Sequence, residues 1–453
     1  MSGGIESGSI EKTKLVKRIE RIEPGVSAID IGSESLFVAV ANEPVKRFGT
    51  FTSEMILLGE YLFSHGVERV AMEATGVYWI PLHDHLDKCG FEVTVFHGAH
   101  ARNLPGRKTD AADCQWHAML HSHGLLSPCF IPPAEILELR SLYRLREDHV
   151  GLGAMYTQQM QKALVLMNVR LHDVISQTTG VSGLRVMEAI VSGERDVKKL
   201  VSLCANQILK RKRDQVEASL HGTWEAHHVF ALRQALEGYR FCQAQMAACD
   251  AQIERWLVEQ TRDLEPKPVQ SSSQVRHNAP VIDDLHGKLV TLSGGRDAGI
   301  LPGISPLGFL KLVGELGTDL SRWPSEKHFV SWLGLAPGRN ESGKRRKRVR
   351  RRKTTAGQIF KEGAMSIAKS KHLALGGFYR RLKGRTSAGV ANTAVARKLA
   401  GLYYRLMTQG LEYVEQGLHE YEKKYTEQSV KRLKKVAQRL GLTVIETQTG
   451  TVI

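Results

Sequence analysis

The sequence has no long apolar run. No uninterrupted stretch approaches the roughly 18 apolar residues of a membrane-spanning helix, and the polar N-terminus has no apolar core like that of a signal peptide. The six cysteines form no C-x-x-C pair and follow no zinc-finger spacing, which argues against structural zinc and favours reduced thiols. We therefore expect a soluble, intracellular protein.

Acidic residues are in the minority. The 453 residues include 63 Lys and Arg against 47 Asp and Glu, and the net charge is +16. Such a balance points to a polyanionic partner. Nine of the ten residues in KRRKRVRRRK, which starts at Lys344 and ends at Lys353, are basic, so much of the excess charge is local.

Short apolar runs alternate with helical patterns between residues 24 and 133, after a polar lead-in over 1–23. The patterns predict strands over 26–31, 36–41, 45–51, 67–72 and 91–96, and helices over 53–65, from 75 to 88, and from Asp110 onward. Three antiparallel strands followed by alternating helices and strands form the order of an RNase H-like α/β domain. In that fold the first strand, the end of the fourth and the last helix approach one another.

Four acidic residues fall at those places. Asp30 and Glu73 lie at or near strand ends, and Asp110 and Asp113 are three apart at the start of a helix, in RKTDAAD. The helix macrodipole alone favours acids near a helix N-terminus and explains the last pair without any function. Four converging carboxylates, however, repel one another unless a divalent cation lies between them, and an all-oxygen set suits Mg²⁺ or Mn²⁺.

Residues 134–265 have an almost entirely helical pattern. Apolar residues step by three and four along two stretches, from Met160 to Val174 and from Val229 to Leu257, which predicts a pair of long helices in a coiled-coil hairpin. A closed helical bundle and a dimerising arm both fit. Gln243 and Asp250 at seam positions fit either a register-setting role or partial exposure.

A linker is predicted over 266–284, a mainly helical domain over 285–418, and a C-terminal helix and tail over 419–453, with the helix stopped by Gly441. The segment LPGISPLGFLKLVGELG, from Leu301, is typical of a helix-hairpin-helix whose exposed amides near Gly303 bind a DNA phosphate. A helix-turn-helix of purely structural use fits equally.

The chain resembles the DEDD-type insertion-sequence transposases, whose RuvC-like domain carries Asp, Glu, Asp and Asp. The matching stretches are AIDIG at Asp30, MEATGVYW at Glu73, and KTDAAD at Asp110 and Asp113. In the C-terminal part, LPGIS, WLGLAPG and NESG resemble the transposase domain of that family. The basic run directly behind Gly343 is denser in charge than that pattern.

The resemblance implies a recombinase in which the four acids bind Mg²⁺, or Mn²⁺, and the serine of the E-S-G step, Ser342, is the nucleophile. It also implies donor and target DNA, a structured guide RNA (the bridge RNA), and a dimer or tetramer whose active site is shared between protomers. A cytoplasmic setting in bacteria or archaea, associated with the nucleoid when active, follows as well.

The basic decapeptide is expected to contact nucleic-acid backbone because it follows the predicted nucleophile, although such runs are also solvated clusters or localisation tracts. The predicted nucleic-acid-binding residues are Lys108, Gly303, Lys344, Arg345, Arg346, Lys347, Arg348, Arg350, Arg351, Arg352 and Lys353. Two alternatives to a recombinase stay open. One is a RuvC-like nuclease that resolves branched DNA by hydrolysis, and the other is a basic nucleic-acid-binding protein without catalysis.

Overall fold

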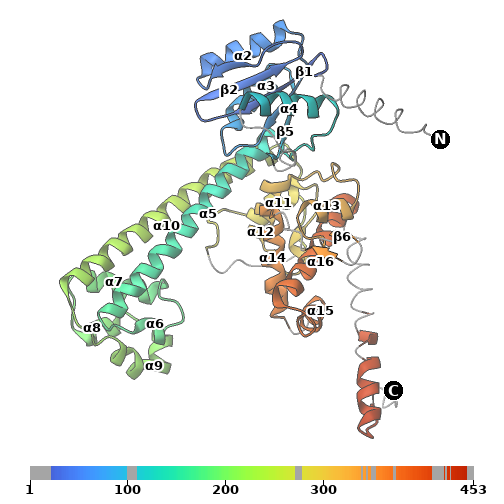
Figure 1. The fold of residues 1–453 in the computed structure, drawn as a ribbon. Helices are drawn as coiled ribbons and strands as arrows, with labels where there is room; N and C mark the ends of the chain where they lie inside the picture. Colours follow the sequence, from blue (N-terminus) through green and yellow to red (C-terminus); the bar gives the residue numbers. More distant parts are fainter. Residues whose placement is uncertain are drawn as a thin grey trace. The chain divides into compact units, whose positions relative to one another are not determined.

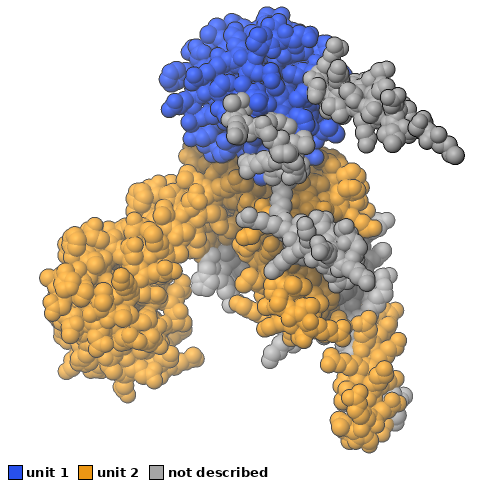
Figure 2. All heavy atoms as spheres, viewed as in Figure 1, with its two compact units in different colours: residues 1–131 blue, residues 132–453 orange. Residues whose placement is uncertain are grey.

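The computed structural model describes residues 22–98, 110–270, 278–337, 340–342, 345–347, 353–370, 374–410, 423, 426–428 and 430–445. They belong to two compact units, one within residues 1–131 and the other within 132–453 (Figure 2). Within these ranges, no helix is both long and apolar enough to cross a bilayer. All six cysteines are free thiols.

The first unit is built on a mixed five-stranded sheet (Figure 1). Its strands are β1 (Val26–Ile31), β2 (Ser35–Val40), β3 (Lys46–Gly49), β4 (Arg69–Glu73) and β5 (Glu92–Phe96). The order is β3-β2-β1-β4-β5, with antiparallel pairing among the first three and parallel pairing of β1 with β4 and of β4 with β5. The five predicted strands are thus confirmed, and the arrangement is compatible with an RNase H-like domain.

Helices cover both faces of this sheet because its strands alternate their side chains between two cores. The helices are α2 (Thr52–Ser64), α3 (Trp79–Lys88) and α4 (Asp110–Ser122). Ile29 and Ile31 of β1 belong to the core formed with α2 and α3, whereas Ala28 belongs to the core formed with α4. Since the side-chain period of a strand is two residues, Asp30 lies on the α4 face.

Small side chains let α4 approach the sheet closely. Ala28 is in register with Ala39 of β2 and with Ala71 of β4, so three alanines form a row beneath the helix. The buried Cys114 thiol donates to the backbone carbonyls of Ala28 at 3.2 Å and Phe37 at 3.0 Å. These contacts fix the position of the α4 N-terminus relative to β1.

Two long helices of the second unit, α5 (Ala134–Leu166) and α10 (Ala226–Thr261), pack side by side (Figure 1). They run antiparallel, because Arg146 pairs with Asp250 while Gly153, further along α5, lies beside Cys242, earlier on α10. Asp250 is buried and ion-paired with the buried Arg146, so the polar seam residue is not exposed.

The prediction that a single long helix runs from Met160 to Val174 is wrong. The helix α5 ends at Leu166, Asn168 has a φ of +57°, and the short helix α6 (Leu171–Val174) follows. Met160 and the residues after the break still share one core with helices α7 (Val181–Val191), α8 (Val197–Ser202) and α9 (Asn206–Ser219). Hydrophobic spacing reports burial and does not detect a turn that keeps the same residues inside.

The rest of the second unit is mainly helical. Its elements are α11 (Leu285–Leu292), a 3-10 helix (Ala298–Ile300), α12 (Pro306–Leu316), α13 (Glu326–Trp332), the strand pair β6 (Asn340–Ser342) and β7 (Arg345–Lys347), α14 (Thr355–Ala368), α15 (Ala374–Lys383) and α16 (Ala388–Gln409). As predicted, a helix precedes Gly441, which has a φ of +69°.

The helix α12 is attached to α5 through a buried acid. Glu315 accepts hydrogen bonds from the hydroxyl of Tyr143 and from Arg144, while Arg140 donates to the carbonyls of Gly314 and Glu315. Breaking such a network leaves a buried charge without its partners, which is costly. These hydrogen bonds join α5 to α12 within the second unit.

Candidate active site

Two parallel strands bring the first two predicted acids together. Asp30 lies one residue before the end of β1, and Glu73 is the last residue of β4. Because β1 and β4 run parallel, their carboxyl ends lie at the same edge of the sheet. Glu73 alternates with Met72 of the opposite core, so it lies on the α4 face, as Asp30 does.

The first turn of α4 adds the other two acids. Burial first, and then the negative charges of Asp110, Glu73 and Asp113, raise the pKa of Asp30 from 3.8 to about 6. All three acids are therefore close enough to disfavour ionisation of Asp30. The structure thus brings the four predicted acids into one electrostatically coupled site within the first unit.

A histidine belongs to this site as well. One ligand atom each from Asp30, Glu73 and His117 lie within 4.8 Å of one another. His117 is buried on α4, one helical turn beyond Asp113 and two beyond Asp110. Sequence reasoning missed it, although the spacing D-x-x-D-x-x-x-H puts all three residues on one helical face and was visible in the sequence.

The backbone of Gly98 limits where the Glu73 carboxylate can lie. A Cβ added at Gly98 would lie 1.8 Å from Glu73 Oε1 and 2.7 Å from Oε2. No side chain fits there unless Glu73 moves. The glycine two residues after β5 therefore serves the site by leaving room for the carboxylate, a role that the sequence patterns did not indicate.

The residues of this site fit a divalent cation. Carboxylate oxygens from several elements converge, and the negative charges of Asp110, Glu73 and Asp113 contribute to the raised pKa of Asp30. A divalent cation offsets such repulsion. The imidazole of His117 is a further donor that transition-metal ions accept.

The predicted nucleophile lies in the other compact unit. Ser342 is the last residue of β6, and its backbone pairs with Arg345 at the start of β7. The structure describes only the backbone of Ser342, Arg345, Arg346 and Lys347. Lys108, Lys344, Arg348, Arg350, Arg351 and Arg352 lie outside the described residues, and Lys353 is exposed.

Gly303 has a packing role in the structure. Its φ is +83°, a conformation that favours glycine, and a Cβ there would lie 2.4 Å from the carbonyl oxygen of Gly363 in α14. The next helix, α12, begins at the cap Ser305, whose hydroxyl accepts from the Gly308 amide. This close approach of two backbones is by itself a reason for glycine at this position.

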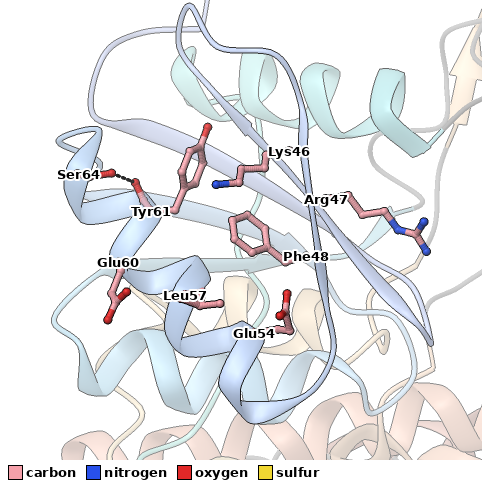
Figure 3. Close-up of a pocket in the computed structure, with 8 residues that line it drawn as sticks. All are labelled: Lys46, Arg47, Phe48, Glu54, Leu57, Glu60, Tyr61 and Ser64. Atoms are coloured by element: carbon pink, nitrogen blue, oxygen red, sulfur yellow. Dashed lines mark hydrogen bonds between the residues drawn. The ribbon is translucent and has the colours of Figure 1, made fainter.

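A surface groove between β3 and α2 lies away from the acids. It is lined by Lys46, Arg47, Phe48, Glu54, Leu57, Glu60, Tyr61 and Ser64 (Figure 3). The ammonium of Lys46 lies 4.3 Å from the Tyr61 ring centroid and 5.0 Å from that of Phe48. Helix α2 belongs to the core on the opposite sheet face from α4. The groove is therefore separate from the acidic site.

Two family models match this chain. One, for DEDD transposases of the IS110 type, is described as a transposase and matches residues 28–169. The second is described as the transposase IS116/IS110/IS902 family and matches residues 300–376. The chain belongs to the DEDD-type IS110 transposases. No curated protein matches it.

Membership of this family makes the protein a DNA transposase or recombinase with DNA as its substrate. The first match begins within β1, runs through the rest of the sheet unit and ends just beyond α5, so it includes all four acids. The second begins at the end of the 3-10 helix and includes Ser342. A DEDD domain also implies dependence on a divalent metal, which agrees with the donor set found here.

Proposed function

We propose that this transposase cleaves and rejoins DNA strands through Ser342, with Asp30, Glu73, Asp110 and Asp113 as its divalent-metal ligands. The observation that carries the metal role is the convergence of the four carboxylates, which together with burial raises the pKa of Asp30. Mg²⁺ is the proposed ion and Mn²⁺ the substitute. When bound, the cation would offset charge on the reacting phosphate and lower the pKa of a coordinated hydroxyl.

A serine nucleophile suits recombination because it conserves the energy of the broken bond. The Ser342 Oγ–P bond forms as a P–O bond of the DNA backbone breaks, the serine proton leaves, and the departing DNA oxygen gains a proton. A hydroxyl of the new strand then attacks the phosphoserine and releases Ser342. Water in place of that hydroxyl would give hydrolysis.

The basic segment gives the proposed nucleic-acid contacts. Exposed Lys353, the remainder of the decapeptide, Lys108 and the Gly303 turn would bind phosphates of DNA or of a structured guide RNA. Because the acids and Ser342 lie in different compact units, the reaction requires those units to meet within one chain or between protomers of a dimer or tetramer.

We further propose that the second unit has separate parts for separate tasks. The antiparallel pair of α5 and α10, within 134–265, would form a coiled-coil arm, and 285–418 would form the transposase domain, joined by the linker 266–284 and followed by the tail 419–453. Burial of Leu232, Leu236, Met246, Ile253 and Leu257 along α10 supports a helical seam.

The test is to mix full-length protein with element-end DNA and Mg²⁺ and to denature the products. A protein–DNA adduct is expected, and it should be absent from Ser342→Ala but present in Ser331→Ala, a matched control at an exposed serine of α13. Asp110→Ala should abolish cleavage. Nicked DNA without an adduct would instead indicate a hydrolytic RuvC-like nuclease, and intact DNA a non-catalytic nucleic-acid-binding protein.

A further inference from the structure

We propose that His117 is a direct ligand of a divalent cation in the part of the site formed with Asp30 and Glu73. This inference rests on the proposed metal role of the acids and goes beyond it, because it adds a nitrogen donor to a set of carboxylates. It also divides the site into two chemically different halves. The half with His117 is expected to prefer Mn²⁺ to Mg²⁺.

The geometry of the three side chains carries the proposal. One donor atom from each of Asp30, Glu73 and His117 lies within 4.8 Å of the other two. Three donors at the corners of a triangle with sides of 4.8 Å lie about 2.8 Å from its centre, so each donor must move by at most about 0.7 Å to reach a bond length of about 2.1 Å. The three residues come from β1, β4 and α4, which are rigid elements joined by the sheet and its core.

The surroundings of His117 hold its ring in place. The side chain is only 5% exposed, and its ring lies edge-on to that of Phe96, with centroids 4.9 Å apart. Phe96 is in register with Glu73 on the neighbouring strand, so the same strand pair supports both donors. A buried ring held this way loses little additional freedom when it binds an ion.

His121 provides an internal comparison. It lies one turn further along α4, is 8% exposed and shares the same buried helix face. The charged groups that act on it are Arg69 and Glu92, at the opposite ends of β4 and β5 from Glu73. His117 and His121 are both buried on one helix and differ in their position along it. Of the two, only His117 belongs to the group around Asp30 and Glu73.

Asp110 and Asp113 form the other half of the site. Both lie in the first turn of α4, on the same helical face as His117, yet neither belongs to the described group of three donors within 4.8 Å. The donor set around His117 thus contains an imidazole, whereas Asp110 and Asp113 offer oxygen atoms only. Oxygen donors suit Mg²⁺, whereas ions later in the transition series accept nitrogen more readily, which gives the two halves different ion preferences.

The experiment uses tag-free, full-length protein and Mn²⁺ alone, without DNA. Pulsed electron paramagnetic resonance of bound Mn²⁺ should show coupling to a directly bound ¹⁴N nucleus in the wild type. His117→Gln should remove that coupling and weaken Mn²⁺ binding about ten-fold or more, with a smaller loss for Mg²⁺. His121→Gln is the matched control and should retain both the coupling and the affinity.

Each outcome decides a separate point. The inference is overturned if wild-type protein binds Mn²⁺ without ¹⁴N coupling, or if His117→Gln changes Mn²⁺ affinity no more than His121→Gln does. The wild-type spectrum is decisive even if His117→Gln fails to fold. Asp30→Asn tests the metal role of the acids separately from the ligand role of His117. If that variant binds Mn²⁺ as the wild type does, the metal role of the acids is wrong.

Discussion

Gly98 offers a direct test of how the fold positions the acidic site. In Gly98→Ala, the new methyl group would lie 1.8 Å from Glu73 Oε1 and 2.3 Å from its carboxyl carbon. Carbon and oxygen atoms that are not bonded approach to about 3.3 Å, so the carboxylate must move by about 1.5 Å. The Glu73 side chain is partly exposed and can swing away, so the fold itself should persist.

The expected consequence is a loss of function with little loss of stability. A misplacement of about 1 Å at a catalytic group can cost roughly 100-fold in rate, so DNA cleavage should fall by about that factor or more. Mn²⁺ affinity should fall in the same variant, because Glu73 is one of the proposed ligands. The measurements are cleavage of element-end DNA under single-turnover conditions, Mn²⁺ titration, and a thermal melt to verify folding.

Gly151→Ala is the matched control. Gly151 lies inside α5, and a Cβ added there would meet open space, so alanine should stabilise the helix by about 0.5–1 kcal/mol and leave cleavage unchanged. Wild-type cleavage and Mn²⁺ affinity in a folded Gly98→Ala protein would refute the reasoning, since Glu73 would then have moved without effect. Loss of activity in both variants would point to a general effect of the substitutions.

Three further outcomes are expected. Asp250→Asn should lower the free energy of unfolding by about 3–5 kcal/mol in urea titrations, because it leaves the buried Arg146 with only the partly exposed Glu147, 4.0 Å away, as a charged partner, and a change below about 0.5 kcal/mol would contradict this. Neutralising Arg350, Arg351 and Arg352 together should reduce the magnitude of the slope of log affinity for duplex DNA against log salt concentration by up to about 2.7. An unchanged slope would count against phosphate contacts there. Removal of divalent ions with a chelator should stop cleavage while DNA binding persists in gel-shift measurements; cleavage that continues at full rate would contradict a metal requirement.

Local sequence patterns predicted the helices and strands correctly where one face of the element is buried. Alternating apolar residues predicted the strands of the first unit, and the spacing of Asp110 and Asp113 predicted their shared helical face. The same reasoning failed at Met167 and Asn168, where a turn interrupts the helix while the apolar spacing continues. It also left the environment of Asp250 open, because a polar seam residue is either exposed or paired, and the pairing partner is 104 residues away.

The sequence by itself determined the order of strands, the acids at their ends and the dense basic run, because these depend on residue type and near neighbours along the chain. Only the tertiary structure decided that His117 joins Asp30 and Glu73, and that Gly98 leaves the space which the Glu73 carboxylate occupies. These relations join residues on different strands and helices, whose separation is set by the row of small alanines under α4 and by the parallel register of β1, β4 and β5. The distances between residues on different elements depend on how those elements pack, and the spacing of residues along the chain does not give them.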